Sequence, residues 1–146
     1  MRAVLIRVEE AVVYIKDEVF SKIEKGLVIF VGFRRTDTDV CLANMAEKIL
    51  NLRVFENEAK KLDYSVKDKS YAILCIPNFT LYANTQKGRR PSFEDAMPRQ
   101  EAFRLFKNFI LLLKSKQLKV SEGAFGEHMQ IKLVADGPLN IILEEN

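Results

Sequence analysis

The chain has 146 residues, a length that predicts one domain, residues 1–146, with a substantial buried core. Hydrophobic residues make up 48% and charged residues 29%, as in ordinary globular proteins, and no apolar stretch approaches the ~20 residues that span a bilayer. The net charge of +3 is too small to identify a nucleic-acid binder. The apolar run at the N-terminus is too short for a signal peptide, so we expect a cytoplasmic protein with no membrane partner.

The first half of the chain is predicted to form strands and one helix. Strands are predicted over residues 2–8, 11–15 and 26–33. Residues 36–39 offer several N-cap candidates, and apolar residues then recur at three- and four-residue steps as far as Leu52. This spacing predicts a helix whose buried face comprises Leu42, Met45, Ala46, Ile49 and Leu50.

The second half is predicted to repeat this pattern of strands and a helix. The polar segment 56–69 and the turn-rich segment 84–93 are predicted loops, the second of them functional. A second helix begins at Pro98, and its apolar face comprises Ala102, Phe103, Phe106, Phe109, Ile110 and Leu113. Extended segments are predicted over residues 71–76, 79–82, 118–120, 128–134 and 139–143.

The number and order of these elements indicate the fold class. Two helices and six to eight strands cannot all pair in simple β-α-β order. We therefore expect an α/β fold, in which a curved, barrel-like mixed β-sheet is covered by two α-helices.

Gly137-Pro138 is the most informative pair in the chain, because it interrupts two strand-like runs. Asp136-Gly137 is suited to the tight turn of a hairpin between them. The alternative is a Gly-Pro corner at a strand edge, with a cis peptide bond and with carbonyl groups free to contact something other than the sheet. The pair by itself leaves both interpretations open.

The sequence contains few of the side chains and motifs that are typical of catalytic sites. His128 is the only histidine and is predicted to lie partly exposed at the start of a strand. No G-x-S-x-G elbow and no glycine-rich phosphate loop occur. Cys41 and Cys75 are far apart and flanked by apolar residues, so we expect buried thiols. One His and two isolated Cys predict no metal site, and no cofactor is expected.

Several motifs in one order carry a resemblance to a known family. Pro77-Asn78-Phe79-Thr80-Leu81 is followed by Arg90-Pro91-Ser92-Phe93, with Arg7 near the start and Gly137-Pro138 near the end. In this order and spacing the chain resembles the D-aminoacyl-tRNA deacylase (D-tyrosyl-tRNA(Tyr) deacylase) family from Arg2 to Leu143. It departs from the family's motifs at Pro77, Asn78, Ala135, Leu139 and Asn140.

The resemblance implies an enzyme that hydrolyses the ester bond of D-aminoacyl-tRNA, and of glycyl-tRNA formed on tRNA-Ala. It implies that the backbone of Phe79 and Thr80, with Asn78, holds the ester and its oxyanion, while the RNA assists its own hydrolysis. We expect the backbone N–H groups of residues 78–80 to be unpaired at a strand end. The Thr80 hydroxyl has no base in sequence reach, so it is expected to orient water or adenosine.

The resemblance further implies a homodimer in which a cis Gly137-Pro138 enters the partner subunit's pocket. Its carbonyls would capture the α-amino group, and an L side chain would collide with the backbone. Arg7 would lock the orientation of the pair. Lys87, Arg89 and Arg90 are weaker candidates for contact with the acceptor end of the tRNA, and no DNA partner is expected.

Two alternatives stand beside this prediction. Pro77 and Ala135 are compatible with a deacylase branch tuned to another mischarged aminoacyl-tRNA. The second alternative is a catalytically silent RNA-binding or dimerisation module of the same fold.

Overall fold

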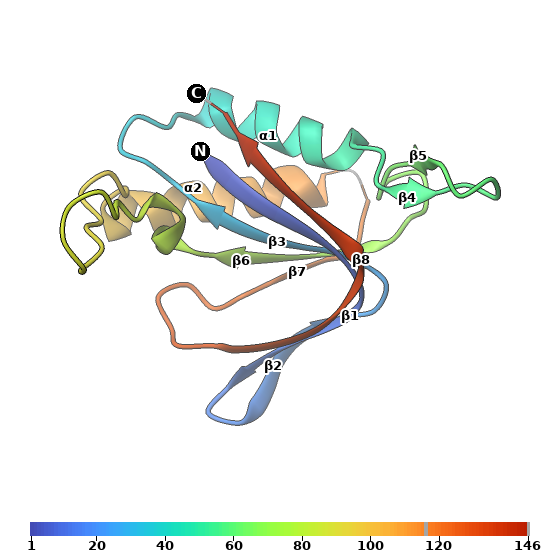
Figure 1. The fold of residues 1–146 in the computed structure, drawn as a ribbon, viewed down its shortest axis with the longest axis horizontal. Helices are drawn as coiled ribbons and strands as arrows, with labels where there is room; N and C mark the ends of the chain where they lie inside the picture. The colour runs from blue at the N-terminus through green and yellow to red at the C-terminus, as the bar shows by residue number, and fades with distance from the viewer. Residues whose placement is uncertain (116, 146) are drawn as a thin grey trace.

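The fold is a curved mixed β-sheet with both long helices on one of its faces (Figure 1). The computed structural model describes residues 1–115 and 117–145. The main sheet has the strand order β2-β1-β3-β6-β7, and β8 pairs with β1. The β3–β6 and β6–β7 pairs are parallel and the others are antiparallel. This arrangement confirms the predicted fold class.

The elements follow one another in an order close to the predicted one. In chain order they are β1 (Arg2–Ile15), β2 (Glu18–Ile23), β3 (Gly26–Gly32), α1 (Asp39–Asn51), β4 (Phe55–Glu56), β5 (Leu62–Tyr64), β6 (Ala72–Pro77), the 3-10 helix η1 (Phe79–Tyr82), α2 (Arg99–Lys114), β7 (Val120–Glu122) and β8 (Gln130–Glu144).

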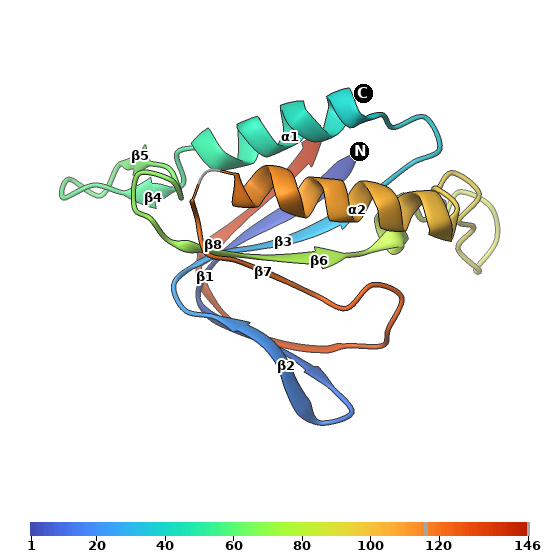
Figure 2. The same cartoon turned by 180° about the vertical axis from the view of Figure 1, so that it is seen from behind.

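The curvature of the sheet comes from β1, which was predicted as two strands and is one strand of 14 residues. Its first half pairs with β3, from Arg2↔Gly32 to Val8↔Gly26. Its second half pairs with β2 instead, beginning at Ala11↔Ile23. Because one strand changes partners half-way along, the sheet turns back below the helices (Figure 2).

Two buried clusters lie on the two faces of this sheet. The larger lies between the sheet and both helices, and Phe106 and Phe109 of α2 are its largest fully buried side chains. The smaller lies on the opposite face, where the sheet turns back, and includes Val8, Val13 and Leu74. Phe103 was predicted on the buried face of α2 but is 48% exposed, because Leu105 is buried in the core while Phe103 packs sideways on Phe125.

Three segments differ locally from prediction. Residues 18–23 form β2, for which the sequence analysis had no strand. Two short strands, β4 and β5, pair around the segment expected to be only a loop. Residues 79–82 are a 3-10 helix and not an extended segment, because the Asn78 side chain accepts a hydrogen bond from the Thr80 N–H and caps the turn.

The hairpin interpretation of Asp136-Gly137 is wrong, because β8 continues along β1 past this point. Between the pairs Ile6↔Asn140 and Val8↔Ala135, β1 has one residue, Arg7, and β8 has four, residues 136–139. The extra residues form a bulge, which leaves backbone groups of β8 out of the ladder.

Neither α1 nor α2, within residues 1–115 and 117–145, has the length and apolar character that crossing a membrane requires. The two ends of the described chain lie side by side (Figure 1), with the Glu145 N–H donating to the Met1 carbonyl over 2.9 Å.

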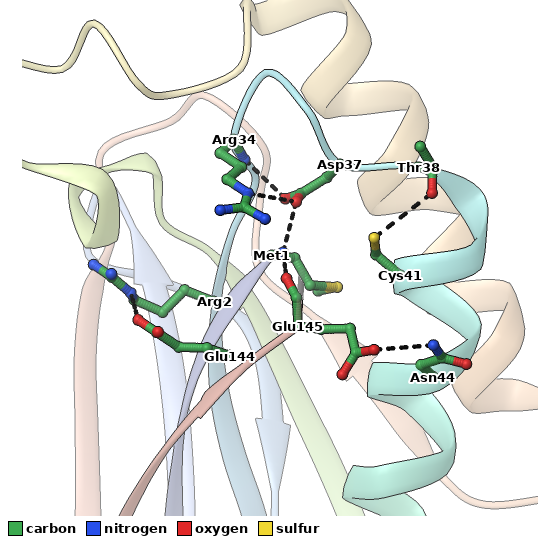
Figure 3. Close-up of polar contacts among 9 residues, drawn as sticks. All are labelled: Met1, Arg2, Arg34, Asp37, Thr38, Cys41, Asn44, Glu144 and Glu145. Carbon is green, nitrogen blue, oxygen red and sulfur yellow. Dashed lines mark hydrogen bonds and ion pairs between the residues drawn. The ribbon is translucent and has the colours of Figure 1, made fainter.

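A buried ion pair holds this end of the molecule together (Figure 3). The Met1 ammonium lies 2.6 Å from Asp37 Oδ1, and both side chains are fully buried. The other carboxylate oxygen of Asp37 accepts the Arg34 N–H over 2.8 Å. Asp37 therefore connects the first strand to the turn before α1.

Asp37→Asn is expected to lower the free energy of unfolding by about 3–5 kcal/mol, because it leaves the Met1 ammonium buried without a counter-charge. Urea denaturation measures this loss. Asp63→Asn is the matched control, since Asp63 pairs with Arg53 at the surface and its loss should cost less than about 1 kcal/mol. Equal midpoints for the two variants would contradict the assignment.

Candidate active site

The predicted catalytic segment lies where β6 ends. The Asn78 N–H donates to the Val31 carbonyl over 2.7 Å, which continues the contact between β6 and β3 by one residue. The Asn78 side-chain oxygen then accepts two hydrogen bonds from Thr80, one from its N–H (3.1 Å) and one from its hydroxyl (2.6 Å). Asn78 thus ends the strand and starts the 3-10 helix.

These contacts correct the prediction that the N–H groups of residues 78–80 are all unpaired. The Asn78 and Thr80 N–H groups are both used inside the protein. Within the described residues, the Phe79 N–H is the one of the three without a hydrogen-bond partner. The segment therefore offers one free main-chain donor.

The 3-10 helix η1 is held against the sheet on two sides. A Cβ added at Gly32 would lie 2.8 Å from the Asn78 carbonyl oxygen and 3.1 Å from the Leu81 Cβ, so only glycine permits this approach. Arg2 donates to the Leu81 carbonyl and lies over the Tyr82 ring, 5.0 Å from its centroid. Burial raises the pKa of Tyr82 to about 12, so this phenol stays neutral.

A cavity of about 470 Å³ opens beside Phe79. It is mostly apolar, and Arg99 is the one charged residue in its lining. Its other walls include Gly32, Pro77, Asn78, Phe93, Met97 and Phe125. Poor solvation strengthens any hydrogen bond that a ligand accepts here. No sequence motif indicates that Gly32, Arg99 or Phe125 belongs to the site.

Gly137-Pro138 forms the centre of the β8 bulge. The peptide bond between the two residues is cis, as the family resemblance implies. Gly137 has φ +153°, and a Cβ there would lie 2.2 Å from the Leu139 nitrogen. No other residue fits this corner without moving the main chain.

Arg7 holds the start of this bulge from the opposite strand. It is 6% exposed, and its Nε lies 3.1 Å from the Asp136 carbonyl oxygen and 3.0 Å from Asp136 Oδ2. Its Nη1 donates to the Val54 carbonyl over 2.7 Å, and Glu56 lies 3.6 Å from Nη2. Arg7 thus contacts the residue before the Gly137-Pro138 pair, and its role in orienting that pair stays a prediction. No sequence motif indicates Asp136, Val54 or Glu56 as its partners.

The two halves of the predicted site lie at opposite ends of β3. Gly26 pairs with Val8 next to the bulge, whereas Gly32 lies against η1. The six residue steps between them, at about 3.3 Å each, span about 20 Å. One chain does not bring Gly137-Pro138 to Phe79, and the expected insertion into a partner subunit stays a prediction.

The basic loop predicted to contact tRNA is defined by Lys87, Arg89 and Arg90. All three are exposed, and none makes an ion pair with another described residue. The ends of the loop are joined by two hydrogen bonds between Asn84 and Ser92, of 2.8 and 2.9 Å. It reaches the pocket through Phe93, whose ring lies 5.0 Å from that of Phe79.

The side chains that serve other hydrolases are not brought together. His128 is exposed, in the segment before β8. Cys41 and Cys75 are buried free thiols, as predicted, and burial raises the pKa of Cys75 far above its usual value. In the part of the chain that the structure describes, no group of three or more His, Cys, Asp or Glu side chains is placed to hold a metal ion.

Comparison with known proteins gives the family. The family model described as D-Tyr-tRNA(Tyr) deacylase matches residues 4–144. The chain belongs to the D-Tyr-tRNA(Tyr) deacylase family. The resemblance inferred from the motifs is thereby confirmed.

Similar proteins and solved structures cover the chain from end to end. A D-aminoacyl-tRNA deacylase of Thermotoga petrophila is 41% identical over all of this chain and 98% of its own length. One of Aquifex aeolicus is 43% identical over 99% of this chain and 97% of its own length.

Two solved structures share the fold of this deacylase-family chain. The one named c-Myc DNA Unwinding Element Binding Protein has a TM-score of 0.94 and 40% identity, and the match covers 100% of this chain and 99% of that one. A probable eukaryotic D-amino acid tRNA deacylase has a TM-score of 0.86 at 16% identity, with 97% of each chain covered, and supports the fold alone.

Proposed function

We propose that this protein hydrolyses the ester bond of D-aminoacyl-tRNA, and of glycyl-tRNA formed on tRNA-Ala, and releases the amino acid and the tRNA. The observation that carries the proposal is the Phe79 N–H, which has no partner within the described residues and lies beside an apolar cavity of about 470 Å³. The family and the relatives of the chain are named for this activity.

The chemistry needs little from side chains. An aminoacyl ester of tRNA is already activated, because the vicinal hydroxyl of the terminal ribose assists the leaving oxygen. The Phe79 N–H then donates to the oxyanion that develops when water attacks the ester. One such donor is worth about 3 kcal/mol of transition-state stabilisation. The rigid attachment of η1 supports this role, since a preorganised donor needs no rearrangement during the reaction.

Chiral selection is assigned to the Gly137-Pro138 corner of a partner subunit in a homodimer. The bulge leaves backbone groups of this corner outside the strand ladder. Arg7 donates a hydrogen bond to the carbonyl of Asp136, the residue just before the corner. These groups would accept the α-amino group of the substrate, so that an L side chain collides with the main chain. Glycine has no side chain to exclude and is therefore accepted.

Contact with the tRNA itself is assigned to the basic loop. Lys87, Arg89 and Arg90 are exposed and unpaired within the described residues, and the loop touches the pocket through Phe93. Phosphate contacts of this kind position a nucleic acid without reading its sequence.

A second candidate function is nucleic-acid binding without turnover. It is favoured by the name of the 40% identical structure, which describes binding to a DNA element, and by the same unpaired basic side chains. The two functions differ in whether an ester bond is cleaved, so one assay separates them.

The purified protein is expected to release the amino acid from D-tyrosyl-tRNA and glycyl-tRNA but to leave L-tyrosyl-tRNA intact. Acid-precipitable label, followed over time for the three substrates, measures this. Binding of all three without release would identify the silent module. Release of a different mischarged amino acid in preference to D-tyrosine would identify a branch with another specificity, for which Pro77, Asn78 and Ala135 are the first residues to exchange.

Arg7→Ala is expected to lower the ratio of kcat/KM for D- over L-tyrosyl-tRNA at least tenfold, because the Asp136 carbonyl loses its donor and the corner can turn. Arg7→Lys tests whether a positive charge without the guanidinium group maintains the D/L ratio. Arg53→Ala is the matched control, since Arg53 is exposed and pairs with Asp63 away from the bulge. If Arg7→Ala changed the rate but left the D/L ratio unaltered, the orienting role would be wrong.

Thr80→Val is expected to retain kcat within about tenfold, because the Thr80 hydroxyl donates to the Asn78 side chain and contacts no base among the described residues. Loss of a true nucleophile costs about 10⁶-fold. Single-turnover hydrolysis of D-tyrosyl-tRNA distinguishes these outcomes, and a loss near 10⁶ would show that the hydroxyl attacks the ester.

A further inference from the structure

A second surface adjoins the pocket, shares Arg99 and Phe125 with it, and is assigned no role of its own in the function proposed above. Phe125 lines the cavity of about 470 Å³ and also two neighbouring hollows, of about 430 and 150 Å³. Arg99 lines the first two of these three. We call the surface formed by Arg99, Gln100, Phe103 and Phe125 the side groove. Because it shares these residues with the pocket, it continues the pocket along the surface.

The side groove lies at the end of the sheet where the site is. Figure 2 shows η1 and the N-terminal end of α2 at the same end of the sheet, with the segment after β7 extending toward that end below them. Arg99 and Phe103 come from the first turns of α2, and Phe125 comes from the segment after β7. Two elements far apart in the sequence therefore form the groove together.

Its floor presents aromatic rings to solvent. The Phe103 ring is 48% exposed and stands edge-on to the Phe125 ring, with centroids 5.2 Å apart. Phe20, which is 49% exposed, lines the next hollow together with Phe103. Exposed apolar side chains that lie together in this way are suited to contact with another molecule.

Arg99 adds an uncompensated positive charge at the junction with the pocket. It is exposed, and within residues 1–115 and 117–145 its guanidinium makes no ion pair. A Cβ at Gly126 would lie 2.4 Å from Arg99 Nη2, and Gly126 has φ +77°. The absence of a side chain at Gly126 thus leaves room for the guanidinium. Its planar set of N–H donors suits a phosphate group.

We propose that the side groove binds the nucleotide preceding the terminal adenosine in the single-stranded 3′ end of tRNA, with its base on Phe103 and its phosphate on Arg99. The inference rests on the proposed function, which brings the terminal adenosine to the pocket. When the last nucleotide of an RNA strand lies in the pocket, the nucleotides before it must follow a surface that adjoins the pocket. The side groove is such a surface, because it continues the pocket. Aromatic rings and a cation along a groove are the features that bind single strands.

The test compares two probes, the ribonucleotide tetramer ACCA and adenosine 5′-monophosphate, by calorimetric titration. The wild-type protein should bind the tetramer more tightly than the mononucleotide. Phe103→Leu keeps an apolar contact with Phe125 but lacks a flat ring, and it should weaken tetramer binding by about ten- to a hundredfold, the loss expected for one stacked base. Arg99→Gln should weaken tetramer binding and reduce its dependence on salt.

Two controls lie on the same helix. Leu111 is 65% exposed outside the groove, and Arg104 pairs with Asp39 of α1. Leu111→Ala and Arg104→Gln should bind the tetramer as the wild type does. Equal affinities of wild type and groove variants for the tetramer, or no tetramer binding at all, would overturn the proposal. A groove variant that changes the molar mass in light scattering would also overturn it, by identifying a contact between subunits.

The outcome is separable from that of the deacylation assay. If the protein cleaves no aminoacyl ester but Phe103→Leu still weakens tetramer binding, the proposed function fails and the groove stands as a site for single-stranded RNA. If D-tyrosyl-tRNA is cleaved and the groove variants bind and turn it over as the wild type does, the groove assignment fails alone.

Discussion

The contact between the buried Arg7 side chain and the half-buried Asp136 is the interaction on which the bulge of β8 depends. Strand β8 follows β1 from end to end and departs from it most at the bulge, where residues 136–139 oppose Arg7 alone. A bulge of this size leaves backbone oxygens without ladder partners. The Arg7 guanidinium contacts the Asp136 carbonyl oxygen and carboxylate, and it also holds Val54 beyond α1. One side chain thus joins the bulge to the helical layer.

At the other end of β3, side-chain contacts likewise hold the backbone in one position. There Asn78 uses its own side chain to pair the Thr80 N–H, while Gly32 and Arg2 hold η1 against the sheet. The result is a Phe79 N–H that no described residue accepts, beside an apolar cavity. In the mechanism proposed above this main-chain donor would stabilise developing charge without a titratable group, and the histidine and both cysteines lie away from it.

Whether a feature could be predicted from the sequence depends on how far apart in the chain the interacting residues lie. Apolar spacing located both helices and most strands, because periodicity reports which face is buried. It misplaced Phe103, since Leu105 competes for the same core and only packing decides between them. It also missed the η1 turn, where one side-chain oxygen of Asn78 overrides the extended tendency of Phe-Thr-Leu-Tyr. Arg7 was identified by the resemblance to the family, but its partners Val54 and Glu56 are about fifty residues away in the chain.

The sequence by itself determined the class of fold and the family, because length, periodicity and the order of short motifs can be read from the chain before it folds. Only the tertiary structure decided that Asp136-Gly137 is a bulge and not a hairpin, that one backbone N–H of three is free, and that Arg99 and Phe125 share a cavity wall. Each of these depends on which distant segments lie side by side, and strand pairing and packing establish that only when the whole chain has folded.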